Sequence, residues 1–286
     1  MTTATNAKMN AASDSAPNAA RHAAGVTPWA TCGRASLWLL AALLPPAAQA
    51  ELTNGTLLGA GLRSRPAYDG SATQQTEAVP VLRYFGPNGF ARSTQGVLEA
   101  GARGEFASGL HAGVQLAYEP GRQASGVPFL ESQRVADVGR GASVGLHVEW
   151  DHSFGPMPVT LLARVRKHTE SDRGLQVDLR LSAGLFKGGR LGAGAFVQTT
   201  WADARSTDSL YGTGAQSVAL AGLPRYTANA GWLQASGGLL WSIDLSPAWV
   251  LVGSVEARRL RGSAARSPLA ERVSNHTLSA GLARQF

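Results

Sequence analysis

The sequence predicts an all-β protein: an antiparallel transmembrane β-barrel of about twelve strands, with ten strands as the alternative count. Three features support this fold class. Apolar and polar residues alternate with period 2 through most of the chain after residue 50, the alternating segments run for about 9–13 residues, and short connections alternate with long ones. Soluble strands average about 5–6 residues, whereas about ten tilted residues cross the apolar band of a membrane barrel. A soluble β-sandwich is the alternative architecture.

The composition excludes several classes of protein. Apolar residues make up 44% of the 286-residue chain and the net charge is +7, so the chain is not intrinsically disordered. No apolar run of about 20 residues is present, which excludes a helical membrane protein. The chain has one cysteine, which excludes a disulfide framework. Basic residues are spread singly rather than in runs, and we therefore expect no nucleic-acid partner.

Residues 1–50 have the features of a secretory signal peptide. Two upstream arginines precede the apolar run Leu37–Leu44, and the small-x-small sequence Ala48–Ala50 forms a cleavage site. Cys32 precedes the apolar run, so it is not the lipid-modified cysteine of a lipoprotein. We therefore divide the chain into a cleaved signal peptide, residues 1–50, and an outer-membrane β-barrel, residues 51–286.

The first half of the predicted barrel contains five strands. The first strand includes Gly59–Gly61, which we interpret as a part of the strand without bulky side chains, and the second carries Pro80. The third and fourth strands are the least well defined, which is why ten strands remain an alternative. The fifth strand alternates apolar residues with His111 and Gln115. The five segments are 54–63, 77–85, 88–94, 96–103 and 109–118.

The second half contains seven strands. From Leu175 to Leu185 the odd positions are apolar, and from Gln176 to Gly184 the even positions are polar or small. A helix would mix these two sets, whereas a strand separates them on opposite faces. The seven segments are 142–153, 157–166, 174–186, 190–201, 231–245, 248–261 and 274–286.

The connections differ in length. Membrane barrels have short periplasmic turns and long outer loops, so an even number of strands places both ends of the barrel in the periplasm. The short connections are 86–87, 104–108, 154–156, 187–189 and 246–247. The longer connections are 64–76, 119–141, 167–173, 202–230 and 262–273.

Aromatic residues are expected at the two membrane interfaces, at opposite ends of the strands. Trp232 does not follow the alternation of its own strand. The residues expected near the short turns are Trp150, Trp241, Trp249 and Phe286, and those expected near the long loops are Tyr118 and Trp201.

The polar faces of the strands would line the lumen. Neighbouring strands place acids beside arginines, so we expect an ion-pair network that includes Glu149, Arg164, Arg166, Asp178 and Arg180. A selective pore or a ligand site is the alternative interpretation of the same side chains. The residues expected in the lumen are His111, His147, Glu149, Asp151, Arg164, Arg166, Asp178, Arg180, Asp244, Glu256 and Arg258.

No catalytic, cofactor-binding or metal-binding residue is predicted. An acyl-transfer site needs a serine, a histidine and an orienting polar group, and His111, His147 and His276 are available. However, the one Gly-x-Ser-x-Gly match, Gly141–Gly145, opens the alternating segment 142–153 and is not followed by a helical pattern, so it is not a nucleophile elbow. The histidines are scattered and no cysteine follows residue 50, which argues against a metal site. Gly59–Gly61 matches half of a dinucleotide-binding fingerprint, but no helical pattern follows it.

Several motifs resemble those of the MipA/OmpV family of outer-membrane β-barrels, and their order and spacing carry the resemblance. The chain departs from the family at its C-terminus, where Gln285 precedes the last residue and Ala283 replaces an aromatic one. The matching segments are Gly59–Gly61, Pro66–Ser71, Pro80, Tyr84, Thr200–Asp203, Tyr211–Gly212, Gly222–Tyr226, Ser267–Leu269 and Arg284–Phe286.

The resemblance implies an outer-membrane barrel of the MltA-interacting type in a Gram-negative bacterium. The best-known member is described as a scaffold that joins a membrane-bound lytic transglycosylase to a bifunctional penicillin-binding protein. Other members are linked to adhesion or to small-molecule response. The implied partners are therefore outer-membrane lipid and periplasmic murein enzymes.

These observations together predict a non-enzymatic scaffold for peptidoglycan-remodelling enzymes. A small-molecule transport or ligand-binding barrel and a surface adhesin are the alternatives. The three functions would use the periplasmic turns, the lumen and the outer loops, respectively. The candidate contact segments of a scaffold are Arg103–Phe106, Phe154–Met157, Lys187–Arg190 and Leu245–Ala248.

Overall fold

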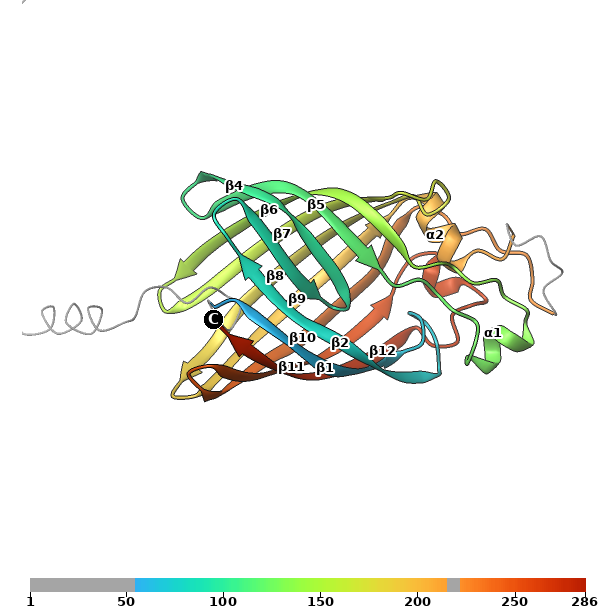
Figure 1. The fold of residues 1–286 in the computed structure, drawn as a ribbon. Helices are drawn as coiled ribbons and strands as arrows, with labels where there is room; N and C mark the ends of the chain where they lie inside the picture. The colour runs from blue at the N-terminus through green and yellow to red at the C-terminus, as the bar shows by residue number, and fades with distance from the viewer. Residues whose placement is uncertain (1–54, 215–221) are drawn as a thin grey trace, which may run out of the picture. The chain divides into compact units, whose positions relative to one another are not determined.

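The computed structural model describes residues 55–214 and 222–286. The predicted signal peptide, residues 1–50, lies outside these ranges. The described chain forms a closed antiparallel barrel in which each strand pairs with its neighbours in sequence and the first strand pairs with the twelfth (Figure 1). The prediction of twelve strands is confirmed, and the alternative of ten is wrong because both doubtful segments belong to the closed barrel.

The strand bounds lie within a few residues of the predicted ones. The first six strands are β1 (Leu57–Pro66), β2 (Gln74–Phe85), β3 (Gly89–Thr94), β4 (Val97–Ala107), β5 (Leu110–Glu119) and β6 (Gly141–Phe154). The other six are β7 (Met157–His168), β8 (Leu175–Gly188), β9 (Leu191–Ala202), β10 (Gly231–Ser246), β11 (Trp249–Leu260) and β12 (Ser274–Gln285).

The two faces of the wall differ in polarity as predicted. On β5, Val114 and Leu116 are 55% and 62% exposed on the outer face, whereas Gln115 between them is 3% exposed. On β8, Leu179 is exposed and Asp178 is buried. An apolar exterior around a polar interior is the pattern of a membrane barrel, because the exterior faces lipid. The alternative of a soluble sandwich is therefore wrong.

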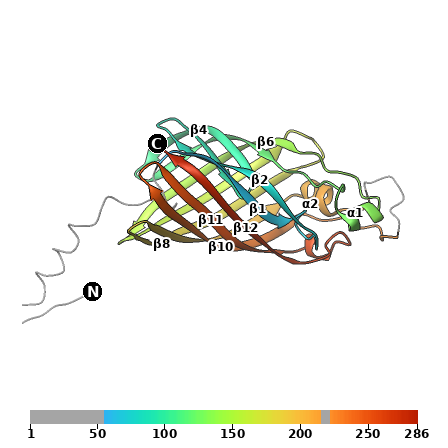
Figure 2. The ribbon, with the colours of Figure 1, turned by 60° about the horizontal axis from the view of Figure 1, so that its bottom comes forward.

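Helices occur at one end of the barrel. Figures 1 and 2 show α1 (Pro128–Ser132) and α2 (Ala204–Tyr211) at the end opposite the C-terminus. We call this the outer end and the opposite one the periplasmic end, because membrane barrels carry their long loops outside. Asp203 caps α2 by accepting a hydrogen bond from the Ser206 amide at 2.7 Å. None of the described helices is long and apolar enough to cross a membrane.

The outer loops pack together into what we call the lid, formed by residues 67–73, 120–140, 203–214, 222–230 and 261–273. One apolar cluster in the lid joins Tyr68, Leu130 and Leu269, which come from three different loops. The short helix η2 (Ala264–Arg266) lies in a second cluster together with Tyr211 of α2. The sequence predicted the loops but not their packing, because their apolar residues follow no regular period.

A β-bulge explains why Trp232 does not follow the alternation of its strand. The pairing of β10 with β9 shifts by one residue between Trp232 and Gln234. As a result, Trp232 is 56% exposed on the outer face while the next residue, Leu233, is buried. Trp232 lies opposite Trp201 in the sheet and joins the aromatic residues near the outer end.

Candidate functional site

Two groups of buried ions, joined through Glu99, cross the lumen. In the first group, the Arg92 guanidinium contacts the carboxylates of Glu99 at 2.8 Å and Glu149 at 2.9 Å. Arg103 approaches Glu149 from β4 at 3.5 Å. These side chains come from β3, β4 and β6, so the contacts join strands that are not all neighbours in the sheet.

The second group lies on β7, β8 and the end of β5. Arg164 contacts Glu99 and reaches Asp178 at 3.3 Å, and Arg166 contacts Asp178 at 2.7 Å. Arg166 also contacts Glu119, which bonds His168 at 3.2 Å. We call the two groups together the charge ladder. Each acid of the ladder contacts at least two basic side chains.

The predicted network is correct in its centre and wrong at its edges. Arg164, Arg166 and Asp178 contact one another as expected. Glu149, however, contacts arginines of β3 and β4 and is linked to Arg164 through Arg92 and Glu99. The guanidinium of Arg180 lies 3.9 Å from the ring centroid of Phe196 and donates to Ser182 and Gln198, rather than continuing the ladder through Asp178.

Sequence reasoning missed five members of the ladder: Arg92, Glu99, Arg103, Glu119 and His168. Glu99 lies between Leu98 and Ala100 and thus has the correct parity for the lumen, which was a usable signal. The signal was weak because β3 has only six residues and β4 is rich in alanine and glycine.

A second cluster of charges lies on β1 and β2. Arg63 and Arg65 share the carboxylate of Glu77, with Nε to Oε1 distances of 2.9 Å and 2.8 Å. The neighbouring Arg258, which was predicted to face the lumen, pairs with Glu256 at 3.0 Å and with Asp69 of the lid at 2.8 Å. The two arginines of β1 therefore share one acid, whereas Arg258 contacts two.

Two of the predicted lumen histidines contact an acid and an aromatic ring. The ring of His111 lies 3.8 Å from the Asp151 carboxylate, and His147 packs edge-on against Phe90. In the described ranges no serine hydroxyl bonds a histidine ring. The same part of the chain contains no group of three or more His, Cys, Asp or Glu residues placed to hold a metal ion.

Polar contacts tie the loops of the lid to one another. The Tyr68 hydroxyl donates to the Leu269 carbonyl at 2.8 Å, and Ser267 donates to the Tyr211 carbonyl at 2.6 Å. Arg122, 2% exposed, donates to the Leu210 carbonyl in the last turn of α2, where the helix dipole favours a cation. Burial raises the pKa of the Tyr68 and Tyr211 hydroxyls and lowers the pKa of the Arg122 guanidinium. The lid is thus closed by apolar packing and by hydrogen bonds between loops.

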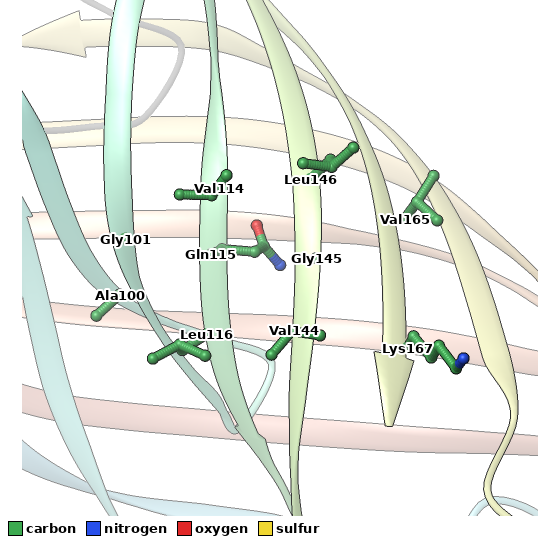
Figure 3. A pocket seen from close by; sticks show the side chains of 10 residues that line it. All are labelled: Ala100, Gly101, Val114, Gln115, Leu116, Val144, Gly145, Leu146, Val165 and Lys167. Carbon is green, nitrogen blue, oxygen red and sulfur yellow. The ribbon is translucent and has the colours of Figure 1, made fainter. Parts of the chain in front are cut away.

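A shallow groove of about 670 Å³ lies on the outside of the wall between β4 and β7 (Figure 3). Val114, Leu116 and Leu146 line it with outward-facing side chains, and Lys167 stands near its outer end. Because these side chains face away from the lumen, the groove is part of the lipid-facing surface and not of the lumen.

The periplasmic ends of three hairpins contain β-bulges. The pairing shifts between Glu105 and Ala107 on β4, between Gly184 and Phe186 on β8, and between Asp244 and Ser246 on β10. The extra residues are Phe106, Leu185 and Leu245, which are 75%, 57% and 48% exposed. Bulges end regular pairing and redirect side chains.

The expected aromatic residues lie at both ends of the strands. Trp150 and Trp249 are exposed near the periplasmic end, together with the C-terminal Phe286. Trp241 differs from the expectation, because it lies within β10 opposite Gly253 and is only partly exposed. Aromatic side chains at both rims are typical of the membrane interfaces of barrels.

A closed twelve-stranded barrel with an apolar exterior, aromatic rims and a charged interior defines an outer-membrane β-barrel protein. The family model described as "MltA-interacting protein MipA" matches residues 58–286 of this chain. The chain therefore belongs to the MipA family, and it is located in the outer membrane of a Gram-negative bacterium.

Solved barrels show distant likeness to this chain. The NanC porin has 9% sequence identity and a TM-score of 0.45, with coverage of 81% of this chain and 100% of that one. The COG4313 outer membrane channel from Pseudomonas putida F1 has 9% identity and a TM-score of 0.43, with coverage of 85% and 99%. No curated protein sequence matches the chain.

Proposed function

We propose that this protein is a non-enzymatic scaffold of the outer membrane that holds a peptidoglycan-remodelling enzyme at its periplasmic end. The family description names an interaction with MltA, and the sequence resemblance implies a lytic transglycosylase and a penicillin-binding protein as partners. A scaffold for such enzymes needs a contact surface that faces the periplasm.

The observation that carries the proposal is the set of three bulges at the periplasmic end. They expose Phe106, Leu185 and Leu245 beside three of the four predicted contact segments. Exposed apolar side chains on rigid hairpins can anchor a partner protein. The fourth predicted segment contributes Phe154 and Met157, which are also exposed.

The lumen and the lid support a scaffold over the two alternatives. The charge ladder places paired, buried side chains inside the barrel along β3 to β8, which is unfavourable for an open transport pore. The lid consists of loops bound to one another, whereas an adhesin would act through outer loops that are free to contact a surface.

The experiment compares two sets of variants in cell envelopes. In the first, Phe106, Leu185 and Leu245 are replaced by serine; in the second, Tyr118 and Trp232 at the outer end are replaced by serine. Both sets remove exposed apolar side chains from barrel rims. Assembly is checked by the shift in gel mobility on heating, and the lytic transglycosylase that co-purifies is measured.

We expect recovery of the transglycosylase to fall about tenfold or more in the periplasmic set and to stay unchanged in the outer set, because hot-spot truncations cost about 2 kcal/mol. Equal recovery in both sets would reject the scaffold. Loss restricted to the outer set would favour recognition at the cell surface.

A further inference from the structure

The wall of the barrel is incompletely paired between β2 and β3. On one side, β1 pairs with β2 from Gln74 to Arg83. On the other side, β3 pairs with β2 only from Arg83 to Phe85. The tip of the β3–β4 hairpin stops short of the outer end of β2 in Figure 1. No described strand therefore pairs with this edge of β2 from Gln74 to Leu82, which we call the seam.

At the periplasmic end of the seam, the backbone hydrogen bonds between β2 and β3 give way to a bond from a side chain. The Ser93 hydroxyl on β3 accepts a bond from the Leu82 amide at 3.1 Å. The backbone groups of Leu82 therefore point toward the seam. Because alternate residues of a strand direct their backbone groups to the same side, those of Pro80 and Ala78 also point into it.

Pro80 fits this position on chemical grounds. Proline has no amide hydrogen, so strands tolerate it only where the missing donor faces an unpaired edge. It also makes the edge a poor template for another strand. The seam is therefore better suited to a ligand than to pairing with a strand of a second protein.

The outer side of the seam is apolar and faces the membrane. Ala78 and Pro80 are exposed on the lipid-facing side of β2. Hydrocarbon cannot satisfy the free backbone groups of the seam, so the polar head of an amphiphile suits the seam itself, and its apolar tail suits the exposed surface of Ala78 and Pro80 on the membrane side.

The lumen side of the seam presents hydrogen-bond donors. The guanidinium of Arg63, a residue 7% exposed, lies against the backbone of Gly96 at the hairpin tip, so close that a Cβ on Gly96 would lie 1.7 Å from Nη1. The preceding residue, Gln95, has a buried side-chain amide nitrogen without a hydrogen-bond partner in the described part of the chain. Arg63 and Arg65 share one carboxylate, that of Glu77, and neither pairs with another acid in the described ranges.

The hairpin tip is a tight two-residue turn. Gln95 has φ of 51° and Gly96 has φ of 84°, and positive φ at both positions is typical of the type I′ turns that two-residue hairpins favour. A turn of this type holds its two residues in one defined backbone conformation. Here the conformation positions the Gln95 amide beside the residue that touches Arg63.

From these features we propose that the seam binds a single-chain amphiphile with an anionic head, entering sideways from the membrane. The head lies at the seam and accepts hydrogen bonds from Arg63, Gln95 and the free amide of Ala78, and the acyl chain lies on the membrane side against the exposed Ala78 and Pro80. Carboxylate and phosphate heads both fit this chemistry, because both accept charge-assisted bonds from a guanidinium. The proposal does not depend on the scaffold role.

The test uses the barrel purified from outer membranes in a neutral detergent, with bound molecules counted by native mass spectrometry. The probes are dodecanoate, dodecyl phosphate, dodecanol and dodecyltrimethylammonium. We expect the two anions to be retained at one per barrel and the alcohol and the cation to be lost. Stronger retention of dodecanoate would identify a fatty acid as the ligand class, and stronger retention of dodecyl phosphate would identify a phosphorylated lipid.

Four variants separate the site from non-specific binding. Arg63→Gln should weaken retention of the anions about tenfold, and Arg63→Lys should keep most of it because the charge remains. Ala78→Trp should block the tail without changing any charge. Its control, Ala257→Trp, adds the same ring at an exposed position of β11, which is paired on both sides.

Two results would overturn the proposal: equal retention of the cation, or unchanged retention of the anions in both Arg63→Gln and Ala78→Trp. If Arg63→Gln fails to fold, as judged by heat-dependent gel mobility, the comparison of Ala78→Trp with Ala257→Trp decides alone. Loss of binding in both tryptophan variants would also reject the seam as the site.

Discussion

Asp178 is the acid on which the centre of the charge ladder depends. It is 1% exposed and accepts contacts from Arg164 at 3.3 Å, from Arg166 at 2.7 Å and from the Thr200 hydroxyl at 2.7 Å. Asp178→Asn keeps the size of the side chain but leaves two buried guanidinium groups short of one carboxylate. We expect a loss of about 3–5 kcal/mol in the free energy of unfolding, measured by urea titration in detergent.

The control for this variant is Asp244→Asn. Asp244 lies on β10, is partly exposed and makes no ion pair in the described ranges. Its replacement should change the free energy of unfolding by less than about 0.5 kcal/mol. Equal losses in the two variants would show that the ladder adds no specific stability to the barrel.

Two tyrosines make the lid sensitive to alkali. Burial, together with the carboxylate of Glu271, raises the pKa of Tyr68, and burial with Asp69 raises that of Tyr211. An exposed tyrosine ionises near about pH 10. Above that pH the folded chain binds more protons than the unfolded one, so the stabilisation present below about pH 10 declines as the pH rises.

The measurement is an alkaline titration that follows tyrosinate by ultraviolet absorbance. The folded barrel should ionise at higher pH than the chain unfolded in urea. In the double variant Tyr68→Phe, Tyr211→Phe this difference should shrink. If the difference in ionisation pH between folded and unfolded chains is the same in the native protein and in the double variant, the shift arises from other tyrosines.

At the scale of single residues, the sequence predicted that acids and arginines pair inside the barrel, but it predicted less well which acid pairs with which arginine. The alternation of β7 and β8 placed Arg164, Arg166 and Asp178 on one face, and adjacent strands made their contact predictable. The contact of Arg92 with Glu149 joins β3 to β6 across the lumen. Period-2 patterns carry no information about which side chains meet across a barrel, since that depends on its diameter and stagger.

The β3–β4 hairpin shows how one glycine supports an element. Gly96 has φ of 84°, and a Cβ there would meet Arg63, which Glu77 holds in place. Gly96→Ala should therefore cost about 1–2 kcal/mol in the free energy of unfolding. Gly104→Ala on the same hairpin is the control, because no atom lies within 4 Å of its Cβ position. Urea unfolding that does not distinguish the two variants would contradict a constrained hairpin tip.

At the scale of elements, the strands were predictable and their irregularities were not. Long segments such as β8 and β10 present a clear alternation, and their predicted bounds differ from the observed ones by only one or two residues. The bulge at Leu233 reverses the alternation, and the nearby Gly231 does not signal it because that glycine also marks the start of the strand. The lid depends on contacts between distant loops, such as the bond from Tyr68 to Leu269, which no local pattern reports.

At the scale of the whole molecule, two separate obstacles lie between the outer medium and the periplasm. The lid closes the outer end through apolar clusters around Leu130 and Tyr211. The charge ladder crosses the lumen below it with side chains that are almost completely buried, including Glu99 and Arg164. The lid and the charge ladder would act as two electrical resistances in series, which add. The flow of ions would therefore remain low while either of them is intact.

This arrangement predicts how conductance in planar bilayers depends on the two obstacles. Leu130→Asp buries a carboxylate in an apolar cluster and should open the lid, because an unpaired buried charge is strongly unfavourable. Glu99→Ser with Arg164→Ser removes two interacting ladder partners together, which limits the unpaired charge left behind. Each change alone should leave the barrel closed, and only their combination should give steady single channels. Steady channels in the native protein or in Leu130→Asp alone would mean that the ladder does not block ions, and the choice of a scaffold over a pore would then lose its support.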